Sequence, residues 1–494
     1  MRQKQNKGLL LFFSVFMLLS MLLDSCHSGD SSGLSTKVKG VQSSPTPGPI
    51  GISRFSPAYT IVDTSLDYPE ANRDQAAVNS ARFLLKGMAR FVNTQIMAWG
   101  VDDPWPDPSQ SEPTNWSSLD AHMKLILATG ATPVITLAEA PWWMKGQVQP
   151  DGTTRLLTQA DEWTNIAYSS RVLDNQMDAW LHLVQRVAER YMAPPYNVRY
   201  FQVWNELKGY FNPITNAYDF TTSPGNPGAP VARHGYTYMY NRVYERLMQV
   251  GRSLKLPPPS IKVGGPYVVM DTWSSVIQSN PSKITKAYGT YDQRSLDVVQ
   301  YWLKHKDGAG FITLDGGNRN NDNVDIADPF TAAEKFADVT AWIRSLDDKV
   351  YPGAATLPIW WAEWYASPYK NPPDEHYDNA VKSYAMIKLL KAGGAVALSW
   401  GSPGNDPASS GLWTDTTSGG GQPFPWYNSF KAFSDTFPPG TVLYPAVVSL
   451  PDVVEALASS TKVMLVNKTA QTVTVTVNGK TTRLGPYEVS VVDA

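Results

Sequence analysis

Pro133-Val134-Ile135-Thr136-Leu137 is a short run in which apolar side chains stand at successive positions rather than at every second one. A strand of this kind has both faces covered, as in a parallel sheet enclosed by helices. Apolar residues recur at helical spacing before it, over residues 119–127, and after it, over residues 177–191. The run therefore indicates an α/β protein with a buried parallel sheet.

Similar β-rich runs recur along the chain after residue 55, and segments with helical spacing of apolar residues lie between them. Strands that alternate with helices in this way favour a closed (β/α)8 barrel, the TIM barrel. The competing architecture is an open, doubly wound sheet, but no glycine-rich phosphate loop follows the first run. The expected strands are Ala58–Asp63, Phe91–Trp99, Thr132–Ala140, Val198–Glu206, Ile261–Val268, Gly310–Gly317, Leu357–Tyr365 and Ala395–Gly401.

The C-terminal part of the chain changes character. Its apolar residues alternate with polar ones, and Asn478-Gly479 predicts a type I′ hairpin turn. We expect a small, β-sandwich-like all-β module that packs on the barrel and borrows a strand from residues around Ile52–Phe55. Its expected strands are Val463–Val466, Thr472–Val477, Thr481–Leu484 and Glu488–Val492.

The N-terminus has the pattern of an export signal. Basic residues precede an apolar run from Leu9 to Leu23, which is short for a membrane span. Cys26 follows in Leu23-Asp24-Ser25-Cys26, which resembles the cleavage site of bacterial lipoproteins except for Asp24. The sequence is compatible both with lipidation of Cys26 and with ordinary cleavage of the signal peptide nearby. In either case we expect an extracellular or cell-surface protein. The predicted organisation is a signal peptide over 1–25, a flexible linker over 26–50, the barrel over 51–435 and the module over 436–494.

The amino-acid composition limits the classes of molecule that this protein is expected to bind. The 42 Lys and Arg residues nearly balance the 44 Asp and Glu residues, so no single-sign field exists to hold a nucleic acid. The 17 Trp and 24 Tyr residues offer flat, weakly polar faces that suit sugars. The six His residues show no metal-ligand spacing and no Gly-x-Ser-x-Gly elbow occurs in the predicted barrel, so we expect no metal, no cofactor and no serine hydrolase. We expect a monomer that acts on an oligosaccharide or polysaccharide.

Two glutamates stand at predicted strand ends, where a barrel of this type carries its reactive side chains. Glu206 ends the fourth strand in Val203-Trp204-Asn205-Glu206, and Glu363 ends the seventh in Trp361-Ala362-Glu363. The fourth and seventh strands lie on opposite sides of an eight-strand ring, so both carboxyl groups can converge over its mouth. A separation of about 5–5.5 Å would permit glycoside hydrolysis by double displacement, with retention of configuration.

These residues resemble clan A of the glycoside hydrolases, whose members carry Asn-Glu after strand four and a nucleophilic Glu after strand seven. With Val263-Gly264-Gly265-Pro266 on strand five, the chain is most similar to family 39, the β-xylosidases and α-L-iduronidases. The resemblance implies that Glu206 is the general acid/base and Glu363 the nucleophile. It further implies that Asn205 binds the sugar 2-hydroxyl and that Trp400 forms an aromatic floor under the reacting sugar.

Other residues at or just beyond predicted strand ends are candidates for sugar contacts: Trp99, Trp142, Tyr267 and Tyr365. Glu139 and Asp315 also stand at strand ends, and either could replace one of the two glutamates if the strands are phased differently. We expect both of them to contact or position the substrate. The sixth strand lacks the His and Tyr that related enzymes often carry there, so the sequence does not indicate which sugar is cleaved.

The sequence thus predicts a retaining glycosidase, with β-xylosidase activity as the first choice. An endo-acting hydrolase of plant or microbial exopolysaccharide is the alternative within this class. A surface lipoprotein that binds glycans without cleaving them is the alternative from another class.

Overall fold

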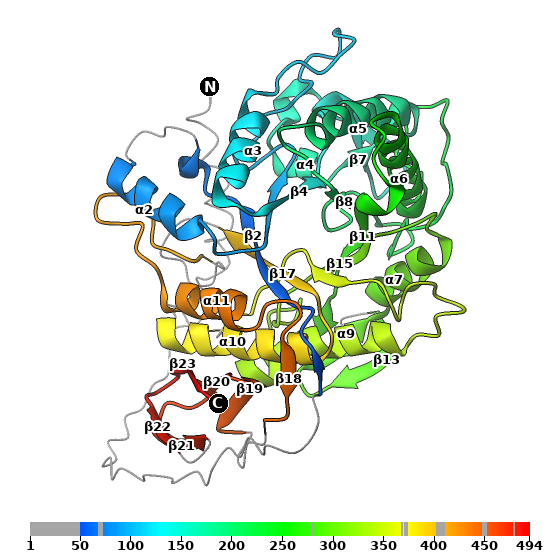
Figure 1. Cartoon of the computed structure of the whole chain (residues 1–494). Coiled ribbons are helices and arrows are strands. Elements are labelled where there is room, and N and C mark those ends of the chain that lie inside the picture. Colours follow the sequence, from blue (N-terminus) through cyan, green and yellow to red (C-terminus); the bar gives the residue numbers. More distant parts are fainter. Residues whose placement is uncertain are drawn as a thin grey trace, which may run out of the picture.

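The computed structural model describes residues 50–67, 73–277, 280–366, 369, 374–401, 411–446, 452–477 and 480–494. The predicted signal peptide, the Cys26 site, the Asn478-Gly479 turn and nearly all of the predicted linker lie outside these residues. Within them, no helix combines the length and the hydropathy that crossing a bilayer requires. Figure 1 shows a ring of helices around a central barrel, with a small β module on one side.

The prediction of a closed barrel is confirmed. Eight strands pair in parallel in chain order, and the last pairs with the first. They are β2 (Ser56–Ile61), β3 (Phe91–Gln95), β4 (Thr132–Leu137), β8 (Tyr200–Val203), β11 (Lys262–Val269), β15 (Phe311–Asp315), β16 (Ile359–Trp361) and β17 (Val396–Gly401).

Helices cover the outside of the barrel. Two consecutive helices, α8 and α9, lie between β15 and β16, and a helix that was not predicted, α11, follows the last barrel strand. Pro425 begins α11, where a missing N–H costs nothing. The principal helices are α2 (Gln75–Leu85), α3 (Ser117–Thr129), α5 (Met177–Met192), α6 (Tyr236–Ser253), α7 (Gln293–His305), α8 (Pro329–Ala333), α9 (Lys335–Ser345), α10 (Glu375–Lys391) and α11 (Pro425–Thr436).

Aromatic rings fill one end of the barrel. Phe91, Tyr200, Phe311 and Trp360 come from the beginnings of four strands, and the Phe311 and Trp360 rings stack with centroids 4.1 Å apart. These rings close the end of the barrel at which the strands begin. Any site must therefore lie at the opposite end.

A layer of polar side chains lies next to these aromatic rings, closer to the ends of the strands. Side-chain hydrogen bonds run from Gln202 to Thr136 (2.8 Å), from Thr136 to Asn93 (2.9 Å) and from Asn93 to Thr60 (3.2 Å), across four neighbouring strands. Polar groups inside a barrel are tolerated because they satisfy one another. The interior thus becomes more polar toward the ends of the strands.

The loops at the ends of three strands carry extra structure. A three-stranded sheet lies between β4 and α5, a hairpin lies between β8 and α6, and another three-stranded sheet lies between β11 and α7. Short helices accompany the first of these. The elements are η3 (Trp142–Met144), β5 (Lys145–Val148), β6 (Thr154–Leu156), η4 (Gln159–Asp161), α4 (Asn165–Tyr168), β7 (Arg171–Val172), η5 (Asp174–Gln176), β9 (Phe211–Asn212), β10 (Ala217–Tyr218), β12 (Thr272–Trp273), β13 (Pro281–Lys286) and β14 (Gly289–Asp292).

The C-terminal module is an antiparallel β structure, as predicted. A five-stranded sheet includes β1 from the N-terminal side of the barrel, which pairs with β18, so the expected borrowed strand is present at Gly51–Ile52. Two of its strands, β18 and β19, were not predicted. The strands are β1 (Gly51–Ile52), β18 (Val442–Tyr444), β19 (Val454–Ser459), β20 (Lys462–Asn467), β21 (Val473–Val477), β22 (Lys480–Leu484) and β23 (Val489–Asp493).

Candidate active site

Glu206 lies in a tight turn directly after β8. The strand ends at Val203, earlier than predicted, because Trp204 (φ 68°), Glu206 (φ 46°) and Leu207 (φ 53°) adopt left-handed backbone conformations. Such conformations cost about 1–3 kcal/mol each for non-glycine residues, and they cluster at functional sites. The fully buried Trp204 ring anchors the turn, since its indole N–H donates to the Lys208 carbonyl at 2.8 Å. The turn thus fixes the direction of the Glu206 side chain.

Glu363 lies two residues after the end of β16 and is only 5% exposed. Tyr267 donates to one of its carboxylate oxygens at 2.8 Å, and Tyr365 donates to the other at 2.5 Å. Burial and the negative charge of Glu206 raise the pKa of Glu363, whereas the two hydroxyl groups and Lys208 oppose that rise. Burial and the charge of Glu363 raise the pKa of both tyrosines, so they remain donors.

A β-bulge aims Tyr267 at the site. In β11 the pairing with β15 skips from Pro266 to Val268, so Tyr267 has no partner across the strands, and its φ is 55°. A bulge next to an active site commonly redirects one side chain. Here it turns the Tyr267 ring into the barrel, where its hydroxyl group reaches Glu363.

Asp315 completes a cluster of three carboxyl groups. One oxygen each of Glu206, Asp315 and Glu363 lies within 4.8 Å of the others. Asp315 is 1% exposed and follows Phe311 and Thr313 on the inward face of β15. On distance alone these three carboxylates could hold a metal ion. A metal ion would have to compete with Lys208 on Glu206 and with both tyrosines on Glu363.

Lys208 supplies the positive charge at the cluster. Its ammonium group contacts Glu206 directly and lies 4.9 Å from the centre of the Tyr168 ring. Burial lowers the pKa of Lys208, but Glu206, Asp315 and Glu363 outweigh that effect and raise it. Asn205 is fully buried and donates to the Tyr168 hydroxyl at 2.8 Å. Tyr168 therefore links the Asn205 side chain to the charged cluster.

The predicted aromatic residues lie at different places. The Trp99 and Trp400 rings meet edge to face at 4.9 Å, and Trp99 also meets Tyr168 edge to face at 6.0 Å. These rings therefore border the cluster through Tyr168. Trp142 begins η3, and its buried indole N–H has no partner among the described residues.

Glu139 belongs to a second buried acidic group. It forms an ion pair with Lys145, whose ammonium group also donates to the Ala167 carbonyl at 2.8 Å. Burial raises the pKa of Glu139 to about 7, although Lys145 opposes the rise. Asp103, which interacts with Glu162, has its pKa raised to about 7, mainly by burial. Glu139 thus lies outside the three-carboxyl cluster and replaces neither glutamate in it.

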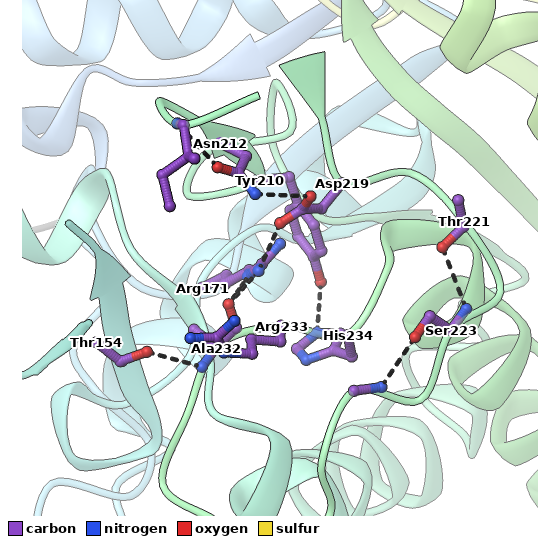
Figure 2. A network of polar contacts seen from close by, with 12 residues as sticks. Thr154, Arg171, Tyr210, Asn212, Asp219, Thr221, Ser223, Ala232, Arg233 and His234 are labelled. Atoms are coloured by element: carbon purple, nitrogen blue, oxygen red, sulfur yellow. Dashed lines mark hydrogen bonds and ion pairs between the residues drawn. The ribbon is translucent and has the colours of Figure 1, made fainter. Parts of the chain in front are cut away.

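The loop after Glu206 is anchored by a polar network (Figure 2). Arg171 donates to Asp219 at 2.8 Å and to the Ala232 carbonyl, and it lies over the Tyr210 ring. The Tyr210 hydroxyl pairs with His234 at 2.8 Å. These contacts tie both ends of the loop to β7 and so stabilise the turn that carries Glu206.

The structure brings most predicted site residues together. Glu206, Glu363 and Asp315 lie together, Tyr267 and Tyr365 donate to Glu363, and Asn205 is connected to the cluster through Tyr168. Sequence reasoning missed Lys208 and Tyr168. A cation two positions after Glu206 is a signal that could have revealed Lys208, but Tyr168 lies in a four-residue helix within a long insertion, where no periodicity points to it.

Comparison with known proteins agrees with the fold. A family model described as the D-apionate lactonase C-terminal immunoglobulin-like domain matches residues 451–492. No curated protein sequence matches the chain.

Solved structures of glycoside hydrolases resemble the whole fold. An endo-β1,6-glucanase has a TM-score of 0.57 at 11% identity, with 92% of this chain and 95% of that one covered. A glucosidase from Croceicoccus marinus has a TM-score of 0.52 at 13% identity, with 90% and 80% covered. A family 30 endoxylanase from Clostridium papyrosolvens has a TM-score of 0.51 at 11% identity, with 90% and 98% covered. At such identities the likeness establishes the architecture alone.

Proposed function

We propose that this protein is a retaining glycoside hydrolase in which Glu206 is the general acid/base and Glu363 the nucleophile. One observation carries the proposal: carboxylate oxygens of the two residues lie within 4.8 Å of each other at the mouth of the barrel. Retaining glycosidases hold their carboxyl groups about 5–5.5 Å apart, whereas inverting enzymes need about 6.5–9.5 Å to admit a water molecule. The spacing favours double displacement.

The surroundings of the two glutamates suit their different roles. Glu363 is 5% exposed, and both of its oxygens accept phenolic hydrogen bonds, which favours an ionised nucleophile. The Glu206 side chain is 17% exposed, so it can meet both the leaving group and the incoming water. In the first step Glu363 attacks the anomeric carbon while the leaving oxygen takes a proton from Glu206. In the second step Glu206 deprotonates water, which releases the sugar from Glu363.

The proposal extends to the sugar that the enzyme cleaves. The Trp-Asn-Glu motif and the glycines of strand five support a β-xylosidase like those of family 39 as the first activity to test. An endo-acting hydrolase of plant or microbial exopolysaccharide is the alternative. Aromatic rings at Trp99, Trp400 and Tyr168 would stack on sugar faces in either case.

The test is hydrolysis of a panel of aryl glycosides and polysaccharides by the wild-type chain and two variants. We expect Glu363→Ala to abolish turnover and external azide to restore part of it with an inverted product. For Glu206→Ala, we expect the glycosylation step to survive only for substrates with good leaving groups. Glycan binding without any cleavage product would instead favour a non-catalytic binding protein.

A further inference from the structure

Two buried carboxyl groups, those of Asp315 and Glu363, and the partly exposed Glu206 lie beside the Lys208 ammonium group at the mouth of the barrel. Lys208 contacts Glu206, and within the described part of the chain no other cationic side chain forms an ion pair with Glu206, Asp315 or Glu363. If all three carboxyl groups were ionised, three negative charges would lie beside one paired ammonium group, with the buried Lys335 interacting with Asp315 without forming an ion pair. Buried charges without partners are too costly to persist, so at least one of the carboxyl groups holds a proton.

The contacts of each group indicate where that proton resides. Glu206 is paired with Lys208, which favours its ionised form. Glu363 accepts hydrogen bonds on both oxygens, which favours its ionised form and opposes the rise of its pKa to about 8 that burial and Glu206 cause. Asp315 has neither kind of support. It is 1% exposed, and its Oδ2 atom has no hydrogen-bond partner among the described residues.

Asp315 and Glu206 also interact with each other through their carboxyl groups. Two carboxyl groups can share a hydrogen bond only if one of them carries the proton. Burial, followed by the charges of Glu363 and Glu206, raises the pKa of Asp315 well above its ordinary value. The missing partner of Oδ2 and the closeness of the other two carboxyl groups therefore favour Asp315 as the group that holds the proton.

We propose that Asp315 stores the proton that Glu206 delivers to the leaving group. The inference rests on the proposed function and makes Asp315 a positioning residue, because it acts through Glu206. As the glycosidic C–O bond breaks, the leaving oxygen forms its O–H bond with the proton on Glu206. The Asp315 proton moves to Glu206 in the same step or before it, so Asp315 ends ionised. In the second step the proton of the attacking water returns to the Glu206–Asp315 pair, which restores the resting state.

The fold holds Asp315 in place for this role. Asp315 is the last residue of β15, its carbonyl accepts the Met270 N–H at 2.8 Å, and its side chain faces inward with those of Phe311 and Thr313. Asp315 at the end of a barrel strand and Glu206 in a turn anchored by Trp204 hold their carboxyl groups at a fixed separation. Fixed geometry of this kind suits repeated proton exchange between two groups.

The test compares Asp315→Asn with the wild-type enzyme on two aryl glycosides of the same sugar. Asparagine keeps the size of the side chain but has no acidic proton to give, so Glu206 stays ionised beside Lys208. We expect kcat/KM to fall about 10²–10³-fold for a poor leaving group and less than about fivefold for a good one. The alkaline limb of the pH profile should move to lower pH, because the proton that Asp315 holds is absent from the variant.

A second substitution makes the test specific. Adding Lys208→Met to Asp315→Asn removes the cation that keeps Glu206 ionised, so we expect Glu206 to hold its own proton and activity on the poor leaving group to recover. Thr313→Val is the matched control: it lies on the same face of β15, one position deeper, and is fully buried. It should leave the ratio between the two substrates unchanged.

Equal losses on both substrates with an unchanged pH profile would overturn the inference and make Asp315 a substrate contact. Activity on the good leaving group verifies that the variant is folded.

Infrared difference spectra of the wild-type protein and Asp315→Asn at neutral pH test the location of the proton without catalysis. We expect a protonated-carboxyl band that the variant lacks, and a wild-type protein without that band would overturn the inference. If the wild-type protein cleaves no glycoside, the proposed function fails, and the infrared result still decides where the proton resides.

Discussion

At the scale of single residues, two phenolic hydrogen bonds favour the ionised form of Glu363, against burial and the charge of Glu206, which raise its pKa to about 8. Removing one of them, as in Tyr365→Phe, leaves one oxygen unsupported, which raises the pKa of Glu363. A nucleophile must be ionised, so its pKa sets the acidic limb of kcat/KM. We expect that limb to move to higher pH by about one unit.

The control for this prediction is Tyr384→Phe. Tyr384 is also buried and donates at 2.5 Å to a carboxylate, that of Glu334, but it lies on α10, outside the site. Its pH profile should match that of the wild-type enzyme. A Tyr365→Phe profile identical to that of the control would show that this bond does not sustain the charge of Glu363.

Sequence reasoning succeeded for residues whose position follows from the barrel rule. Glu206, Glu363 and Asp315 could be placed together because parallel strands end at one face of the barrel. The ion pair of Lys208 and the contact of Tyr168 with Asn205 depend on the path of two loops, which no periodicity encodes. For the same reason the sequence suggested substrate contact for Asp315 but not its interaction with Glu206.

At the scale of elements, the loop from Trp204 to Gly235 determines whether Glu206 is held in place. Asp174 anchors this loop, since its carboxylate accepts the N–H groups of Asn226, Arg233 and His234 and pairs with the His234 ring at 2.8 Å. These bonds outweigh burial and lower the pKa of Asp174. The anchor needs close approach of the backbone, which Gly225 provides.

We expect Gly225→Ala to break this anchor. Its φ is +66°, and an added Cβ would lie 2.0 Å from Asp174 Oδ2. The free energy of unfolding should fall by about 2 kcal/mol, and kcat should fall because Glu206 loses its support. Gly228→Ala is the control in the same loop, where the nearest atom is 3.6 Å away. Thermal unfolding and kinetics of both variants check this, and equal behaviour of the two would contradict it.

The barrel strands could be predicted from sequence to within a few residues because their apolar runs are buried on both faces. The inserted strands β5, β9 and β12 could not be predicted, since each is only two to four residues long, too short to show an alternation of apolar and polar residues. The strand ends at Val203 and Trp361 also differ from prediction. At Val203 the pattern of apolar residues continues, but left-handed backbone conformations stop the pairing.

At the scale of the whole molecule, one face of the C-terminal module packs into the main hydrophobic core, while its other face forms a separate apolar cluster. Leu457, Met464 and Val466 of the module belong to the main cluster of buried apolar residues, and the Tyr377 and Tyr487 rings meet at 4.4 Å. The β1–β18 pairing adds a second tie between the start of the barrel and the module. The short alternating strands predicted this packing, because so small a module buries too little apolar surface to be stable alone.

The central claim is that Glu206 and Glu363 act on one anomeric carbon by double displacement. Proton NMR of the first product released by the wild-type chain, recorded before mutarotation, tests it most directly. We predict that the product has the same anomeric configuration as the glycoside cleaved, because two inversions restore it. A first product of inverted configuration would contradict the account.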